Sequence, residues 1–151
     1  MTTDLNDLWR FDLRRGKSSD PREGACLLDA VSWLEYGTLG DHPPCVCPVI
    51  AAFGRRINDA MSDAGRQRLK VFLPRLVGTV DPSAEQARAE YLAWVAIRVF
   101  APMTPRDEDA MVATLDGVLK IGRQAESIEP SIFATAQQTF EAARCTPEKE
   151  L

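Results

Sequence analysis

At five places a proline precedes an apolar run with helical spacing: Pro21, Pro48, Pro82, Pro105 and Pro130. Proline fits the first turn of an α-helix, where its missing N–H group costs nothing, and it breaks a helix elsewhere. Asp20, Asp81 and Thr104 stand directly before three of these prolines and can accept hydrogen bonds from the free N–H groups. The prolines therefore divide the chain into helices with predictable starting points.

The first two helices are the most sharply defined. One is expected to begin at Asp20–Pro21, with Glu23 completing a capping box, and to end at Gly37. The next begins at Pro48. Its apolar stripe has the spacing of an amphipathic helix and consists of Val49, Phe53, Ile57 and Met61. Its opposite side carries Arg55, Arg56, Asn58 and Asp59.

The remaining helices follow from the same signals. Ser62 is expected to cap a helix that breaks just before Pro74 and ends at Gly78. The helix after Asp81–Pro82 is apolar on most faces, which predicts a central position. The helix opened by Thr104 to Asp107 buries Met111, Leu115, Val118 and Leu119, and a last one, from about residue 129, carries Ile132, Phe133, Ala136 and Phe140.

These elements predict an all-α fold, a compact bundle of about five to six helices with an extended N-terminal arm. The length of 151 residues suits a single domain. We expect the arm at residues 1–18, the helical domain at 19–146 and a frayed tail at 147–151. Strand-like alternation occurs only in the arm, at Trp9, Phe11 and Leu13.

Composition excludes several classes of function. The net charge of −4 argues against a general nucleic-acid binder, which needs surplus positive charge to neutralise phosphates. No apolar run approaches the roughly 20 residues of a membrane-spanning helix, and the N-terminus has no signal-peptide core. Four cysteines in such a chain are expected to be reduced thiols, which predicts a cytoplasmic protein.

The loop Asp41-His42-Pro43-Pro44-Cys45-Val46-Cys47-Pro48 holds the only histidine and two of the cysteines. Zinc is one alternative for this loop, with His42, Cys45, Cys47 and Cys26 as ligands, although the one-residue spacing between Cys45 and Cys47 is shorter than usual. A second alternative is a nucleophilic Cys47 at a helix start, with His42 and Asp41 directing a proton. We favour a third, a rigid connector stiffened by its prolines, and expect no metal cofactor.

Two basic clusters lie on neighbouring predicted helices. Arg55 and Arg56 belong to the first of these helices, and Arg66, Arg68 and Lys70 to the second. Together they can form a positive surface that recognises an acidic protein. The favoured interpretation is a solvated face that pairs with Asp59 and Asp63. No phosphate-binding glycine motif and no His-Glu-x-x-His zinc motif occurs.

The segment from about Cys26 to Thr79 resembles uncharacterised bacterial and phage-borne proteins that share a D-H-P-x-C-x-x-P core. The resemblance covers roughly a third of the chain and implies no catalytic residues. It does suggest that this loop and the two helices after it form a unit, and that the protein came from a mobile element.

The leading functional hypothesis is a non-catalytic helical protein that binds a protein partner or itself. Its positive evidence is the arm, because the large apolar groups of Trp9, Phe11 and Leu13 must pack either onto their own domain or onto another chain. Arg55 and Arg56 are further candidates for an interaction surface. Occlusion of a host protein is the variant that a phage origin would suggest.

Overall fold

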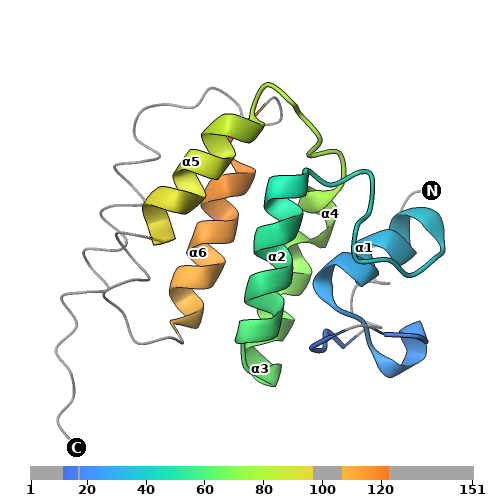
Figure 1. Cartoon of the computed structure of the whole chain (residues 1–151). Helices are drawn as coiled ribbons and strands as arrows, with labels where there is room; N and C mark the ends of the chain where they lie inside the picture. The colour runs from blue at the N-terminus through green and yellow to red at the C-terminus, as the bar shows by residue number, and fades with distance from the viewer. Residues whose placement is uncertain (1–11, 17, 97–106, 123–151) are drawn as a thin grey trace, which may run out of the picture.

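The computed structural model describes residues 12–16, 18–96 and 107–122. Within these ranges the regular structure is helical, and Leu13 and Ala25 form an isolated parallel β-bridge (Figure 1). The all-α fold class is therefore confirmed. The expected last helix from about residue 129, the tail at 147–151, Trp9, Phe11 and Cys145 lie outside the described residues.

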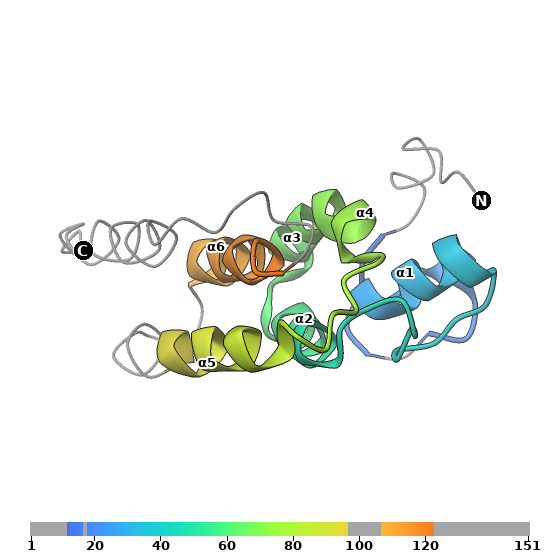
Figure 2. The same cartoon turned by 90° about the horizontal axis from the view of Figure 1, so that it is seen from above.

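The helices form two rows when viewed from above (Figure 2). One row contains α5 (Glu85–Val95) and α2 (Pro48–Ala60), and the other contains α6 (Glu108–Leu119) with α3 (Asp63–Arg66) and α4 (Leu73–Leu76). Helix α1 (Leu27–Tyr36) packs against α2 and α4 at one end of the rows. Helix α2 is central, since it also contacts α5 and α6.

The first helix starts later than predicted. After Asp20 the chain forms η2, a 3-10 turn over Pro21–Glu23, and α1 begins only at Leu27. The break lies at Gly24, whose φ of +101° is a conformation that side chains disfavour. A Cβ atom at this position would lie 2.7 Å from the carbonyl oxygen of Asp12. The predicted end at Gly37, in the left-handed conformation, is confirmed.

Helix α2 begins at Pro48 as predicted, but one residue on its supposed polar side is buried. Asn58 is fully buried, and its side-chain oxygen accepts a hydrogen bond from the Leu27 N–H at 3.1 Å. Its amide nitrogen donates to the carbonyl of Arg14 at 3.0 Å. Asn58 therefore joins α2 to the start of α1 and to the N-terminal segment.

The predicted helix from Ser62 is divided into three pieces. Ser62 caps α3 as expected, accepting a hydrogen bond from the Gly65 N–H at 3.1 Å. The chain then tightens into η3, a 3-10 helix over Gln67–Phe72, before α4 places Pro74 in its first turn. The break expected before Pro74 is confirmed, because proline cannot supply the N–H that a continuous helix needs.

Arg66 and Lys70 are buried, so the prediction of one solvated basic face was wrong for both. The guanidinium of Arg66 donates to the carbonyls of Asn58 at 2.5 Å and Met61 at 2.6 Å, at the end of α2. The predicted pairing with Asp63 does occur, at 2.7 Å from Arg66. Arg66 thus satisfies carbonyls that the end of α2 leaves without intrahelical partners.

The Asp81–Pro82 pair opens a turn rather than a helix. Asp81 accepts hydrogen bonds from the N–H and hydroxyl groups of Ser83, and α5 begins at Glu85. Within the described part of α5, Arg88, Tyr91 and Val95 are the buried residues, so the prediction of a helix buried on most faces was wrong there.

Helix α6 buries the residues predicted for it and begins at Glu108, while Thr104 to Arg106 of its predicted opening lie outside the described residues. Asp107 caps it by accepting a hydrogen bond from the Ala110 N–H, and Met111, Leu115, Val118 and Leu119 are all buried. No helix in the described part of the chain has both the length and the apolar character needed to span a membrane.

Candidate functional site

Two hollows lie on either side of Arg55. The first, which we call the acidic cavity, has a volume of about 170 Å³ and is lined by Gly16, Cys26, Asp41, Arg55, Asn58 and Asp59. The second, the proline groove, has a volume of about 270 Å³ and is lined by His42, Pro43, Pro44, Val46, Pro48, Ala51, Arg55, Val80 and Glu85. Arg55 lines both, and its Nη1 donates to the carbonyl of Asp41 at 2.8 Å.

Cys26 at the acidic cavity is the N-cap of α1. Its Sγ accepts from the Asp29 N–H at 3.4 Å, and the thiol donates to Asp29 Oδ2 at 3.2 Å. Burial raises the pKa of the Cys26 thiol to about 12. Since the thiolate is the reactive form, this cysteine is a neutral capping group at physiological pH and not a nucleophile.

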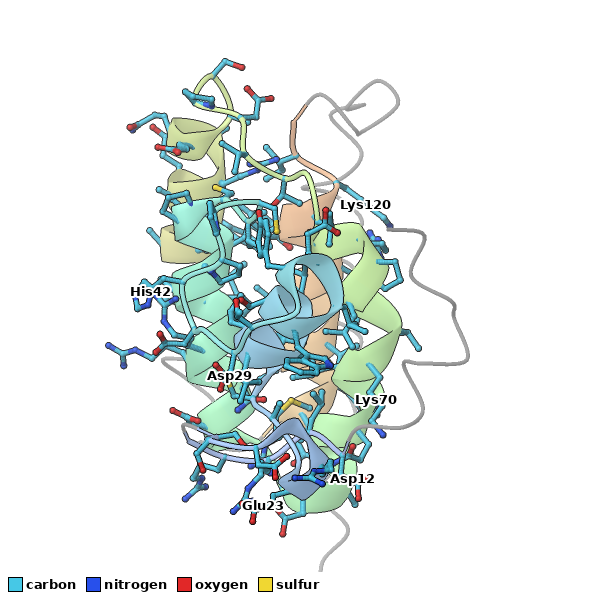
Figure 3. All side chains as sticks on the ribbon, turned by 90° about the vertical axis from the view of Figure 1, so that its right-hand side faces the viewer. Asp12, Glu23, Asp29, His42, Lys70 and Lys120 are labelled. Carbon is cyan, nitrogen blue, oxygen red and sulfur yellow. The ribbon has the colours of Figure 1, made fainter. Side chains whose placement is uncertain are left out.

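Asp29 is a buried carboxylate that no sequence motif singles out. Figure 3 shows it on α1, on the side of the molecule where His42 also lies. Within the described residues, its Oδ1 has no hydrogen-bond partner, while Oδ2 is held by Cys26. The pair Cys26–Asp29 is therefore a local capping arrangement at the start of α1.

The other walls of the acidic cavity hold the N-terminal segment in place. Asp59 Oδ1 accepts from the Gly16 N–H at 3.3 Å, and Asn58 binds the carbonyl of Arg14. These polar groups are thus engaged in joining the segment to α2.

Two hydrogen bonds fix the loop that lines the proline groove. The Gly78 N–H donates to the carbonyl of Cys45 at 2.9 Å, and the Cys47 N–H donates to the hydroxyl of Thr79 at 2.9 Å. Val46, which lines the groove, and the neighbouring Cys47 are buried, while Val80, also in the lining, is 47% exposed. The loop at 41–47 is therefore held by the segment that follows α4.

The four residues considered for zinc are not brought together. Among the described residues, no group of three or more His, Cys, Asp or Glu side chains is placed to hold a metal ion. Cys26 is buried at the start of α1 and Cys47 beneath the loop, whereas Cys45 is half-buried. His42 points outward, with Nδ1 2.8 Å from Asp41 Oδ1 (Figure 3), and this contact lowers the pKa of Asp41.

Cys47 precedes α2, as the nucleophile hypothesis requires, but its side chain is fully buried. A substrate cannot reach this thiol in the described conformation. His42 is paired with Asp41 on the exposed side of the loop. The residues of the proposed nucleophilic site therefore lie in separate environments.

The predicted basic surface is smaller than expected, because Arg66 and Lys70 are buried. Arg56 is exposed and Arg55 is half-buried, while Arg68 pairs with Asp109 at 2.8 Å. Asp59, expected to pair with these arginines, instead binds the Gly16 N–H. Among the predicted interaction residues that the structure describes, Arg55 borders both hollows.

Of the three apolar arm residues, the structure places Leu13, which is 2% exposed. It packs back onto its own domain, so it is a core residue rather than an exposed contact for another chain. Gln67, which bonds to Leu13, and Asn58, which bonds to the adjacent Arg14, were not identified from the sequence as the groups that hold this segment. Both have charged neighbours in the sequence, so their surroundings gave no sign of a contact with the N-terminal segment.

Comparison with protein-family models, curated proteins and solved structures gave no significant match to this chain.

Proposed function

We propose that this protein is a non-catalytic protein-interaction module and that the proline groove is its contact site for a protein partner. The observation that carries this proposal is a preformed, mainly apolar hollow of about 270 Å³ with charged groups at its rim. Interfaces commonly pair an apolar pocket that accepts one anchoring side chain with a polar rim. Arg55, His42 and Glu85 supply that rim.

The stiffness of the groove favours binding. Two long-range hydrogen bonds, Gly78 to Cys45 and Cys47 to Thr79, hold the loop before any partner arrives. Prolines at 43, 44 and 48 restrict the backbone further. A surface that is already ordered loses little conformational entropy on association, which leaves more of the contact energy as affinity.

The fold, compartment and kind of partner that accompany this proposal are those expected from the sequence. We take the chain to be one compact bundle of five to six helices with an extended N-terminal arm, acting in the cytoplasm without general nucleic-acid binding. The resemblance to phage-borne proteins suggests occlusion of a host protein as the form that binding takes. Neither cysteine chemistry nor zinc is part of this function.

Two exposed valines allow a matched test. Val80 borders the groove and is 47% exposed, while Val71 lies on η3 and is 59% exposed. Immobilised wild-type protein, Val80→Asp and Val71→Asp are compared for proteins captured from a lysate of the source cells. We expect a partner that wild type and Val71→Asp retain and Val80→Asp loses at least tenfold. Equal capture by all three proteins, or capture of nothing, would refute the proposal.

A further inference from the structure

Residues 12–16, which we call the arm segment, lie in the domain as a bound peptide lies in a receptor. The Leu13 N–H donates to Gln67 Oε1 at 3.0 Å, and Gln67 Nε2 donates back to the Leu13 carbonyl at 2.7 Å. On the other edge, the Arg14 N–H donates to the carbonyl of Ala25 at 2.9 Å, and the Ala25 N–H donates to the carbonyl of Asp12 at 3.1 Å. This is how an extended peptide is recognised along both edges of its main chain.

The groove that receives the arm segment is made by elements distant in sequence. Ala25 precedes α1, Asn58 and Asp59 belong to the end of α2, and Gln67 begins η3. Leu13 fills the apolar centre, and Lys70 Nζ lies 3.6 Å from Asp12 Oδ1 (Figure 3). The groove around the arm segment thus accepts an extended peptide. It bonds to the peptide's main chain, buries one leucine and forms one ion pair with the residue before that leucine.

The connection between the arm segment and the rest of the domain is short. It follows Gly16 and ends at Gly24, and the φ angles of these two glycines are +80° and +101°. Its described ties include the Ser18 hydroxyl, which donates to the carbonyl of Gly24 at 2.6 Å, and the three-residue turn η2. Fully extended, a connection of this length spans roughly 30 Å.

We infer that the groove also accepts the arm segment of a second copy of this chain, so that two copies associate by exchanging arms. Exchange reproduces the contacts of the arm segment with Ala25, Gln67 and Lys70, because the same residues meet across the two copies. It alters the connection at 17–24, and short connections favour such exchange. The partner is therefore this chain itself, at a surface separate from the proline groove.

Cross-linking of mixed chains tests the exchange. Asp12→Cys protein is mixed with Lys70→Cys protein after brief partial unfolding and refolding, and a short bismaleimide is added. Exchange predicts a covalent heterodimer whose joined peptides contain positions 12 and 70. The control mixture is Arg75→Cys with Asp116→Cys, whose native side chains meet at 2.6 Å between elements of the helical body. We expect at least a fivefold excess of heterodimer over this control.

A single chain that carries both Asp12→Cys and Lys70→Cys is the positive control. Its cross-linking shows that the protein is folded and that the cross-linker can join positions 12 and 70. At low concentration it should cross-link within one molecule, and the share of covalent dimer should rise with protein concentration. Adding Leu13→Asp should abolish both products. Heterodimer at the level of the control mixture, or cross-linking within single molecules at every concentration, would overturn arm exchange. Failure of the double variant to cross-link at all would also overturn it, because the closed contact itself would be missing.

Discussion

The side-chain amide of Gln67 pairs with the main chain of Leu13 through two hydrogen bonds, one to the N–H and one to the carbonyl. An amide side chain here takes the place of a neighbouring β-strand. The two residues are 54 positions apart, so this pair joins the N-terminal segment to η3. Stability of the arm segment should depend strongly on Gln67.

Gln67→Ala is expected to lower the free energy of unfolding by about 1–3 kcal/mol, because two main-chain groups lose their partners. Gln86→Ala is the matched control. Gln86 is exposed on α5 and its amide donates to the exposed Glu90, so we expect a change within about 0.5 kcal/mol. Urea denaturation measures both. Equal effects would show that the Gln67 contact contributes nothing beyond an ordinary surface pair.

The N-cap of α1 can be tested by exchanging one atom. Cys26→Ser keeps an acceptor for the Asp29 N–H and a donor for the Asp29 carboxylate. Cys26→Ala removes both, which should cost about 1 kcal/mol more than the serine variant. Thermal or urea unfolding of the two variants compares them directly. An alanine variant as stable as the serine variant would rule out a capping role.

Alkaline pH should destabilise the fold through buried groups. Burial raises the pKa of Cys26 from 9.0 to about 12 and that of Tyr91 from 10.0 to about 12. A raised folded-state pKa gives stability that is complete below the unfolded pKa and is lost as pH rises toward the folded value. The free energy of unfolding should therefore fall between about pH 9 and 12. Cys26→Ser should show a shallower decline, and iodoacetamide should leave Cys26 unlabelled at pH 8.

Gly117 leaves room for the ring of Tyr91. A Cβ atom at position 117 would collide with the Tyr91 hydroxyl, and Tyr91 is buried with little freedom to move. Gly117→Ala is expected to destabilise the fold by about 1–3 kcal/mol, despite the better helix propensity of alanine. In a Tyr91→Phe background the cost should shrink. An unchanged cost there would mean that the hydroxyl is not the obstacle.

Arg88 joins three parts of the fold. Its guanidinium donates to the carbonyl of Thr79 at 2.6 Å and to that of Ile121 at 2.8 Å. Arg88→Met keeps the length of the side chain but leaves both buried carbonyls without this donor, and should cost about 2–5 kcal/mol. Arg56→Met, at an exposed position of α2, should change stability by less than about 0.5 kcal/mol. Chemical denaturation of the pair provides the measurement.

The helices that the sequence predicted best are those whose first turn is self-contained. Pro48 and Asp107 begin α2 and α6 because proline and an aspartate cap act within a few residues. The Asp20–Pro21 opening carries the same local signals but yields only a 3-10 turn. There the close approach of Asp12 to Gly24 imposes a backbone conformation that interrupts the helix. Asp12 and Gly24 are 12 positions apart, so a sequence pattern spanning a few residues does not reveal their contact.

The candidate site was predicted less well, for a related reason. Helical spacing placed Asn58 with Arg55 and Arg56, since all three are polar. Asn58 is nevertheless buried, because it bonds to main-chain groups of two other segments. Arg66 is buried for the same kind of reason, at the end of α2. The meeting of Cys26, Asp41 and Arg55 around one cavity depends on how α1 packs on α2, which a single-helix pattern does not encode.

The long-range pairing of Leu13 with Gln67 also has a kinetic consequence. Helices form from contacts between near neighbours, whereas closing a loop of this size carries an entropic cost before any contact is gained. The Gln67 amide and the Asn58 amide are in position only after α2 and η3 have assembled. Docking of the arm segment is therefore a late step in folding. Residues 12–16 precede the helices in the chain, but they are expected to reach their native position after them.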